Sequence, residues 1–222
     1  LTINATPVVT DLLDVAGVCD SYTLPAITGT NLTGSEAYYT GSLGTGTSYI
    51  AGDVLSYDAL ETYPITLYIY DSIGTTPNVC SDEESFTLTI NTTPGITDLV
   101  DITDACGSYT LPAITGTNLT GSEAYYTGSL GTGTSYVAGD VLSYDALETY
   151  PITLYIYDKI GTAPNVCSDE ESFALTINAT PILTGLSDIT ICDSYTLPSI
   201  TGTNLTGTEA YYTGSLGTGT SY

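Results

Sequence analysis

The stretch Ile65-Thr66-Leu67-Tyr68-Ile69-Tyr70 alternates strictly between aliphatic side chains and Thr or Tyr side chains. Successive side chains of an extended strand point to opposite faces, so the aliphatic residues share one face. The stretch Ser85-Phe86-Thr87-Leu88-Thr89-Ile90 shows the same alternation a short distance further along. Both patterns predict strands that bury one face.

Shorter strands are expected where β-branched or aromatic pairs stand between turn-forming residues. These runs lie around Val8-Val9, Tyr22-Thr23-Leu24, Ala37-Tyr38-Tyr39 and Tyr49-Ile50. A Gly-rich hairpin loop is expected at 41–49, and a single helical turn at 57–61. About seven short strands with turns every 8–12 residues predict an all-β, immunoglobulin-like β-sandwich.

The chain repeats itself with a period of 87, because Leu1-Thr2-Ile3-Asn4 returns at Leu88 and again at Leu175. Residues 21–71 differ from 108–158 at one position, Ile50 against Val137. The third copy stops at Tyr222, the counterpart of Tyr49. We therefore expect an excerpt of a longer protein, with repeats at 5–91 and 92–178 and a truncated third repeat at 179–222.

The joints between repeats contain Pro7, Pro94 and Pro181 and no Gly/Ser tether. Proline stiffens such joints, so tandem domains forming a semi-rigid rod are expected, each adding about 30–40 Å. A period of 87 suits independent β-domains better than stacked solenoid repeats.

The composition excludes several function classes. The 222 residues include 25 Asp and Glu, one Lys or Arg and no His, for a net charge of −24. Without His there is no Ser-His-Asp triad and no His-based metal site. With one cation there is nothing to neutralise phosphates, so nucleic acid and anionic membrane surfaces are not expected partners. No apolar stretch approaches the length that crosses a bilayer.

The five cysteines follow the repeat. Cys19 and Cys80 are 61 residues apart, as are Cys106 and Cys167, and Cys192 is the counterpart of Cys19. One pair per repeat predicts the intradomain disulfides Cys19–Cys80 and Cys106–Cys167, with the partner of Cys192 beyond the excerpt, in an oxidising compartment. Each loop of this length would contribute about 4 kcal/mol. The first repeat contains no Lys, which excludes an isopeptide staple there.

The densest acidic runs are candidate calcium ligands, near Asp71 and Asp158, with a solvated loop as the alternative. They comprise Asp82, Glu83, Glu84, Asp169, Glu170 and Glu171. Calcium is the only cofactor that the sequence suggests. A glycosidase carboxylate pair is not expected, since identical acids in every repeat would make every repeat an enzyme. The chain is predicted not to be an enzyme.

Tyrosine pairs are candidate sugar-stacking residues, with cross-strand packing as the alternative. These are Tyr38, Tyr39, Tyr125 and Tyr126. Glycan attachment is a further expectation, since Asn-x-Thr sequons recur through this Thr-rich chain. The candidate acceptors are Asn31, Asn118 and Asn204, together with Ser72 in the Asp-Ser-aliphatic sequence. The second repeat has Lys159 at the position of Ser72.

The run Cys106-Gly-Ser-Tyr-Thr-Leu-Pro112, followed by Tyr-Tyr-Thr-Gly, Ala-Gly-Asp-Val, Ile-Tyr-Asp and Pro-Asn-Val-Cys-Ser-Asp-Glu, resembles a family of tandem repeats. These are the immunoglobulin-like repeats of long surface adhesins in gliding Bacteroidota, which are typically exported by type IX secretion. The resemblance covers essentially every repeat. It implies an extracellular, cell-surface protein and carries no catalytic residues.

Three roles follow from these patterns. The first is a structural stalk or spacer of a repetitive adhesin, whose partners are neighbouring repeats of the same chain. The second is a subunit of a self-assembling extracellular filament, with identical chains as partners through exposed Tyr or sheet edges. The third is a repeated polysaccharide-binding module that gains avidity from its repeats.

Overall fold

The computed structural model describes residues 3–57, 63–145 and 148–222, and these residues form strands, turns and one short 3-10 helix, η1 (Ser215–Gly217). The helical turn expected at 57–61 lies, apart from Tyr57, outside the described residues. The first repeat contains β1 (Val8–Val9), β2 (Val15–Cys19), β3 (Ser21–Thr23), β4 (Gly29–Thr30), β5 (Ala37–Gly41), β6 (Thr45–Tyr49), β7 (Val54–Ser56), β8 (Ile65–Thr75) and β9 (Asn78–Asn91).

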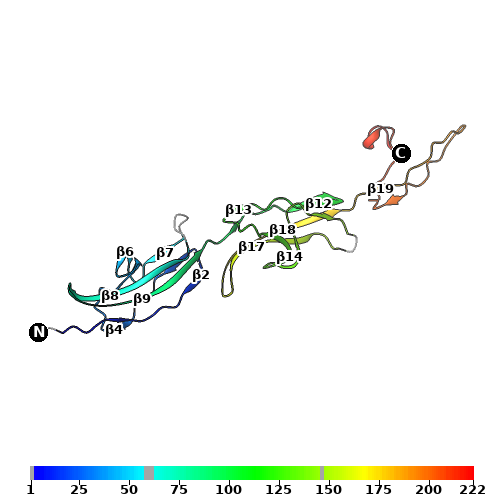
Figure 1. Ribbon diagram of the computed structural model, residues 1–222. Coiled ribbons are helices and arrows are strands. Elements are labelled where there is room, and N and C mark those ends of the chain that lie inside the picture. The colour runs from blue at the N-terminus through cyan, green and yellow to red at the C-terminus, as the bar shows by residue number, and fades with distance from the viewer. Residues whose placement is uncertain (1–2, 58–62, 146–147) are drawn as a thin grey trace. The chain divides into compact units, whose positions relative to one another are not determined.

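The second repeat forms the same nine strands in the same order (Figure 1). They are β10 (Gly95–Ile96), β11 (Ile102–Cys106), β12 (Ser108–Thr110), β13 (Gly116–Thr117), β14 (Ala124–Gly128), β15 (Thr132–Tyr136), β16 (Val141–Ser143), β17 (Ile152–Thr162) and β18 (Asn165–Asn178). The third repeat forms only β19 (Ile182–Leu183) and β20 (Gly202–Thr203) among its described strands.

The main sheet of the first repeat has the order β2-β9-β8-β5-β6. The long β8–β9 hairpin is at its centre, with a continuous antiparallel register from Ile65↔Leu88 to Thr75↔Asn78. Strand β2 runs parallel to β9, while β5 and β6 pair antiparallel on the other side. The second repeat has the equivalent order β11-β18-β17-β14-β15.

Short strands form the opposite layer, where β1 pairs with β4 and β3 pairs with β7. Aliphatic and aromatic side chains of both layers fill the space between them, as the alternation of β8 and β9 predicted. The buried core is Val9, Leu24, Tyr38, Leu55, Leu67, Ile69, Phe86, Leu88 and Ile90. Two layers with this strand order and a parallel first–last pairing form an immunoglobulin-like β-sandwich, which confirms the predicted fold class.

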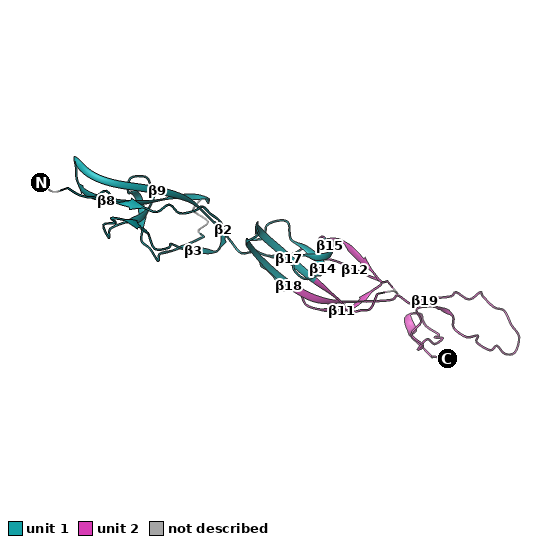
Figure 2. Cartoon of the chain, turned by 90° about the horizontal axis from the view of Figure 1, so that it is seen from below, with its two compact units in different colours: residues 1–98, 114–136, 155–171 teal, residues 99–113, 137–154, 172–222 magenta. Residues whose placement is uncertain are grey.

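The chain divides into two compact units (Figure 2). Unit 1 contains residues 1–98, 114–136 and 155–171, and unit 2 contains residues 99–113, 137–154 and 172–222. Within unit 2, residues 179–222 include no counterpart of β8 or β9. Leu197 is accordingly 43% exposed, whereas its counterparts Leu24 and Leu111 are 1% exposed.

One buried carboxylate in each complete repeat holds a loop against the main sheet. Asp71 is 2% exposed, and its Oδ2 accepts a hydrogen bond of 2.8 Å from the backbone N–H of Thr33. Its Oδ1 accepts another from the Thr33 hydroxyl. Asp158 makes the same two bonds with Thr120 and also accepts one from the Lys159 backbone N–H. These bonds offset the cost of burying the charge.

We predict that Asp71→Asn destabilises the first repeat by about 1–3 kcal/mol, because an amide group turns a donor toward one of the Thr33 donors. Urea denaturation followed by circular dichroism measures the change. The matched control is Asp11→Asn, which removes the same charge from an exposed position of the same repeat. Equal stability of the two variants would contradict this role of Asp71.

Candidate functional site: a disulfide joint between consecutive repeats

Cys19 and Cys167 form a disulfide, with an S–S distance of 2.05 Å and a Cα–Cα distance of 5.5 Å. Cys19 ends β2 of the first repeat, and Cys167 lies near the start of β18 in the second repeat. Cys167 is the counterpart of Cys80, so the bond joins two consecutive repeats. Both cysteines belong to unit 1. Cys80, Cys106 and Cys192 carry free thiols.

The predicted intradomain disulfides Cys19–Cys80 and Cys106–Cys167 are therefore wrong, and the strand register gives the reason. Cys19 lies opposite Asn91 at the far end of β9. Cys80 is eleven residues earlier on that strand, which at 3.3 Å per residue places it about 36 Å away. A disulfide needs Cα atoms within about 7 Å. Cys106 has the same register with Asn178, so the same argument applies to the second repeat.

The strand end at 16–19 has a backbone suited to a close approach. Gly17 has φ +70°, a conformation that L side chains rarely adopt. A Cβ atom at Gly17 would lie 2.9 Å from Nδ2 of Asn91, so a larger residue would push this amide away. The neighbouring carbonyl of Ala16 accepts a hydrogen bond of 2.6 Å from Nδ2 of Asn165 in the second repeat.

The hairpin tip at 160–167 is covered where it meets this strand end. Cys167 is 1% exposed and Asn165 is half-buried. At the equivalent tip of the first repeat, 73–80, Cys80 is half-buried and Asn78 is exposed. The two tips have nearly the same sequence, so the lower exposure of Cys167 and Asn165 results from contact with the strand end.

The carboxylate of Asp20 adds two hydrogen bonds at the same joint. Asp20 has φ +61°, and its two side-chain oxygens accept hydrogen bonds from the Thr93 backbone N–H at 2.8 Å and the Thr93 hydroxyl at 2.7 Å. The backbone bond, followed by the hydroxyl bond, lowers the pKa of Asp20 below its usual value. Asp20 thus holds the linker that leaves β9, next to the disulfide. Gly107 occupies its position in the second repeat.

Several acidic side chains of the predicted calcium site accept hydrogen bonds from separate backbone N–H groups. Asp82 Oδ2 accepts from the Val9 N–H at 2.8 Å, and Asp169 Oδ2 accepts from the Ile96 N–H at 2.7 Å. Glu83 and Glu170 accept from the Leu43 and Leu130 N–H groups. Among the residues that the structure describes, no group of three or more Asp, Glu or Cys side chains lies close enough to hold a metal ion.

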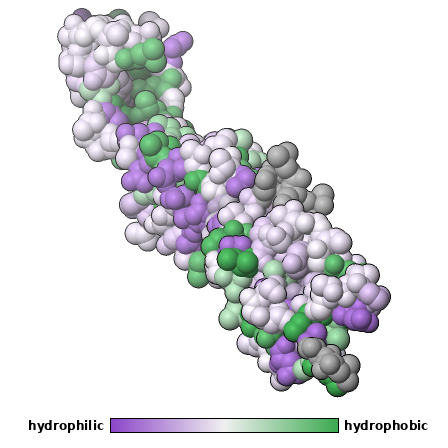
Figure 3. Space-filling view, turned by 90° about the vertical axis from the view of Figure 1, so that its left-hand side faces the viewer, coloured by the Kyte–Doolittle hydropathy of each residue, from purple (hydrophilic) through white to green (hydrophobic). Residues whose placement is uncertain are grey.

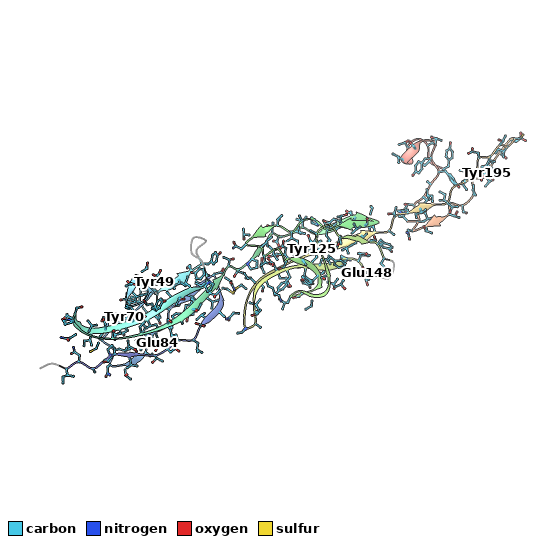
Figure 4. The ribbon with its side chains drawn as sticks, in the orientation of Figure 1. Tyr49, Tyr70, Glu84, Tyr125, Glu148 and Tyr195 are labelled. Carbon is cyan, nitrogen blue, oxygen red and sulfur yellow. A yellow bond between two sulfur atoms is a disulfide. The ribbon has the colours of Figure 1, made fainter. Side chains whose placement is uncertain are left out.

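The remaining two predicted calcium ligands also lie along the hairpins. Glu84 is opposite Ile69 on the β8–β9 ribbon (Figure 4). Glu171 forms a side-chain hydrogen bond with Asp98, which, with some desolvation and repulsion from Asp98 and Asp169, raises the pKa of Glu171. The structure therefore does not gather the predicted calcium ligands in one place.

The Tyr pairs divide between the two faces of the main sheet. Tyr38 and Tyr125 are fully buried, so these two residues were wrong as ligand-binding candidates. The Tyr38 hydroxyl donates to the Pro25 carbonyl at 2.9 Å, and burial raises the pKa of Tyr38 to about 12. Tyr39 and Tyr126 are half-buried on the outer face, in edge-to-face contact with Tyr70 and Tyr157.

A hollow of about 200 Å³ lies beside the outer Tyr pair of the second repeat, within unit 1. Its walls are Tyr126, Tyr157, Leu130, Asp158 and Lys159, with Ser122 and Gly131. Gly131 has φ +69°, and a Cβ atom there would lie 2.8 Å from the Tyr157 ring, so only glycine leaves this ring in place. The sequence patterns identified Tyr126 but not Tyr157 or the single Lys.

The predicted glycan acceptors lie at exposed turns. Asn31, Asn118 and Asn204 all have φ between 53° and 56°, and each donates from Nδ2 to a backbone carbonyl, of Thr6, Thr93 and Thr180 respectively. This amide nitrogen is the atom that would carry a glycan. Ser72 is half-buried on β8 opposite Ser81. Glycosylation at these positions stays a prediction.

No protein-family model and no curated protein matches the chain. Among solved structures it is similar to the N-terminal four Ig domains of Dscam1 isoform 9.44, with 10% identity and a TM-score of 0.38 over 80% of this chain and 47% of that one. It is also similar to Dscam1 isoform 4.4, with 12% identity, a TM-score of 0.34 and the same two coverages. Human CDH23 EC21-23 shows 16% identity and a TM-score of 0.32 over 76% of this chain and 63% of that one.

The chain thus spans about half the length of these Dscam1 structures. The strand order and register described above identify the fold. No helix among the described residues is long and apolar enough to cross a membrane.

We predict that the disulfide keeps the chain in one piece after trypsin cleavage. Trypsin cuts only after Lys159, the single basic residue, into 1–159 and 160–222. In the Cys106→Ser variant, alkylated and unfolded in urea without reductant, Cys19–Cys167 should hold both fragments together on a denaturing gel.

Reductant should then separate the two fragments, and a Cys19→Ser/Cys106→Ser control should release them without it. Release of the fragments from non-reduced Cys106→Ser would instead mean that Cys19 pairs with Cys80.

We predict that Asp20→Asn reduces the loss of stability in acid. Because folding lowers the pKa of Asp20, its contribution is complete above the unfolded value of about 3.8 and is lost as the pH falls through the lower folded value. Thermal unfolding of oxidised chain and variant should therefore differ at pH 6 and converge toward pH 2. A constant difference across this range would contradict the assignment.

Proposed function

We propose that this chain is a non-catalytic structural spacer of a repetitive extracellular surface adhesin, in which consecutive repeats are joined covalently. The observation that carries this proposal is the Cys19–Cys167 bond between neighbouring repeats. Near-identical repeats suit a spacer, because a spacer needs length and stiffness and not a distinct site in each domain. The resemblance to the repeats of Bacteroidota adhesins supports the same role.

An extracellular location is part of the proposal. Structural disulfides persist in oxidising compartments and are rare where thiol reductants are abundant. The charge of −24 and the Thr- and Gly-rich surface are compatible with a solvated, non-adherent shaft; the visible face is largely white and purple with separate green patches (Figure 3). The same charge opposes lateral association, which makes a spacer a better fit than a laterally packed filament.

The joint gives the spacer a mechanical property. Tension along the chain enters through β1 and β2, crosses the Cys19–Cys167 bond and leaves through β18. The 147 residues between the two cysteines are bypassed, and they stay at low extension even if their strands separate. A shaft built this way resists lengthening by a route that does not depend on the stability of each sandwich.

A second role, binding of surface polysaccharide, is favoured by one observation. The hollow beside Tyr126 and Tyr157 combines an aromatic wall with Asp158 and Lys159, a set of groups that suits a sugar ring with polar substituents. The first repeat has Ser72 in place of Lys159, so the two repeats would not bind equally. This asymmetry argues against identical, avidity-driven binding by every repeat.

We predict that reduction lengthens the fully stretched chain by about 500 Å, the contour of the 148-residue separation between the bonded cysteines. Force spectroscopy on the 222-residue chain, held at both ends, measures this length. The Cys80→Ser/Cys106→Ser/Cys192→Ser variant is used so that only the Cys19–Cys167 pair remains.

Adding Cys19→Ser to that variant is the matched control and should give the long extension without reductant. If the oxidised three-serine variant already stretches to the full contour, the covalent spacer role is refuted.

A further inference from the structure

The joint consists of two complementary surfaces, and each recurs elsewhere in the chain. One is the hairpin tip, 160–167 in the formed joint and 73–80 in the first repeat. The other is the strand end, 16–19 in the formed joint and 103–106 in the second repeat. One tip and one strand end are bonded to each other. The remaining tip, with Cys80, and the remaining strand end, with Cys106, carry free thiols.

The free tip matches the bonded one residue by residue. Gly74, Asn78 and Cys80 correspond to Gly161, Asn165 and Cys167. Asn165 supplies the hydrogen bond to the opposing carbonyl, and Cys167 supplies the covalent bond. Both positive-φ glycines, Gly74 and Gly161, hold the turn in the same form. The free tip thus presents the same donor and the same thiol, both more exposed than in the joint.

The free strand end keeps the strand register of the bonded one, although Asp104 does not share the positive φ of Gly17. Cys106 is in register with Asn178, as Cys19 is with Asn91. The backbone N–H of the residue after each cysteine donates a hydrogen bond of 2.8 Å to the carbonyl of that Asn. Three side chains differ, since Thr103, Asp104 and Ala105 replace Ala16, Gly17 and Val18. The group that accepts the Asn bond is a backbone carbonyl, which this replacement retains.

We propose that the tip at 73–80 is a docking site for the cysteine-bearing strand end of another repeat of this kind, joined to it by a Cys80 disulfide equivalent to Cys19–Cys167. The inference rests on the proposed spacer function and extends its joint to the free half-sites. The occupant is a repeat whose β2-type strand ends in cysteine, either in a longer chain or in a second copy.

The bond requires an oxidant, and a small disulfide such as oxidised glutathione serves. One protein thiolate attacks the oxidant and releases one glutathione thiol. The second protein thiolate then attacks the mixed disulfide and releases the other glutathione thiol. Two protein S–H bonds are lost, one protein S–S bond forms, and the two protons and two electrons leave on the two glutathione molecules.

The test mixes variants of the 222-residue chain in a glutathione redox buffer. A tip variant, Cys106→Ser/Cys192→Ser, keeps the Cys80 thiol. The end variant, Cys80→Ser/Cys192→Ser, keeps the Cys106 thiol at the end of β11. A control variant, Cys80→Ser/Cys106→Ser, keeps Cys192, whose segment forms no described strand. We expect tip plus end mixtures to give a disulfide-linked heterodimer about tenfold more abundant than either homodimer, because only that pair has complementary surfaces.

The fit is tested separately from thiol reactivity. Asn78→Ala in the tip variant removes the hydrogen bond that Asn165 makes in the formed joint, and it should lower the heterodimer yield several-fold. Asn4→Ala, an exposed position outside the tip, is the matched control and should have no effect.

The docking proposal would be overturned if the end variant gave heterodimers no more abundant than homodimers. Equal yields from Asn78→Ala and Asn4→Ala would also overturn it. Trypsin cleavage after Lys159 is run on the same samples without reductant. Fragments that stay linked in the tip variant while no heterodimer forms would refute the docking site and leave the joint between consecutive repeats intact.

Discussion

The parallel pairing of β2 with β9 fixes where the cysteines of a repeat lie, and the joint depends on it. The register places Cys19 beside Asn91, where the chain leaves the sandwich toward the next repeat. The length of the β8–β9 hairpin places Cys80 at the other end of the same sheet. A disulfide cannot bridge that distance. Cys19 therefore bonds Cys167 of the following repeat, and the sandwich itself is held by its apolar core.

Acidic side chains accept hydrogen bonds from backbone N–H groups that longer strands would pair within a sheet. Strands of two or three residues leave backbone N–H groups without ladder partners, and such groups are costly when buried. Asp82 and Asp169 accept from the first short strand of each complete repeat, and Asp71 and Asp158 accept from the loop that follows β4 or β13. Carboxylates suit this task because they accept strongly from N–H groups. Much of the dense charge in the hairpins is thus structural.

The sequence was sufficient for the strands with clear alternation and insufficient for pairing partners. The alternation at 65–70 and 85–90 predicted two strands with one buried face, and these strands form the central hairpin. Strand β2 was not predicted, because Gly17 interrupts the pattern of Val15–Cys19. The Gly-rich segment expected as a loop instead contains β6, whose small residues show no alternation of polarity. For the Tyr pairs, the strand pattern predicts that one ring of each pair points into the core. It does not indicate which of the two rings this is.

The disulfide shows a limit specific to repeats. The separation of the bonded cysteines, 148, is one period longer than the spacing of 61 within a repeat. The repeating pattern of cysteines is therefore compatible with a partner in the same repeat and with one in the next repeat. Only the direction of β2 relative to β9 distinguishes them, and that direction follows from long-range pairing that no local pattern encodes.

Where such a joint recurs at every junction, the covalent loops overlap. A loop closed by Cys19 and Cys167 includes Cys106, from which the next loop begins. Most residues of an inner repeat then lie within two loops, so breaking one disulfide leaves them enclosed by the other. Intradomain disulfides would give separate loops with unprotected linkers between them. The register of one parallel strand pair thus determines whether the same number of cysteines reinforces isolated domains or the whole array.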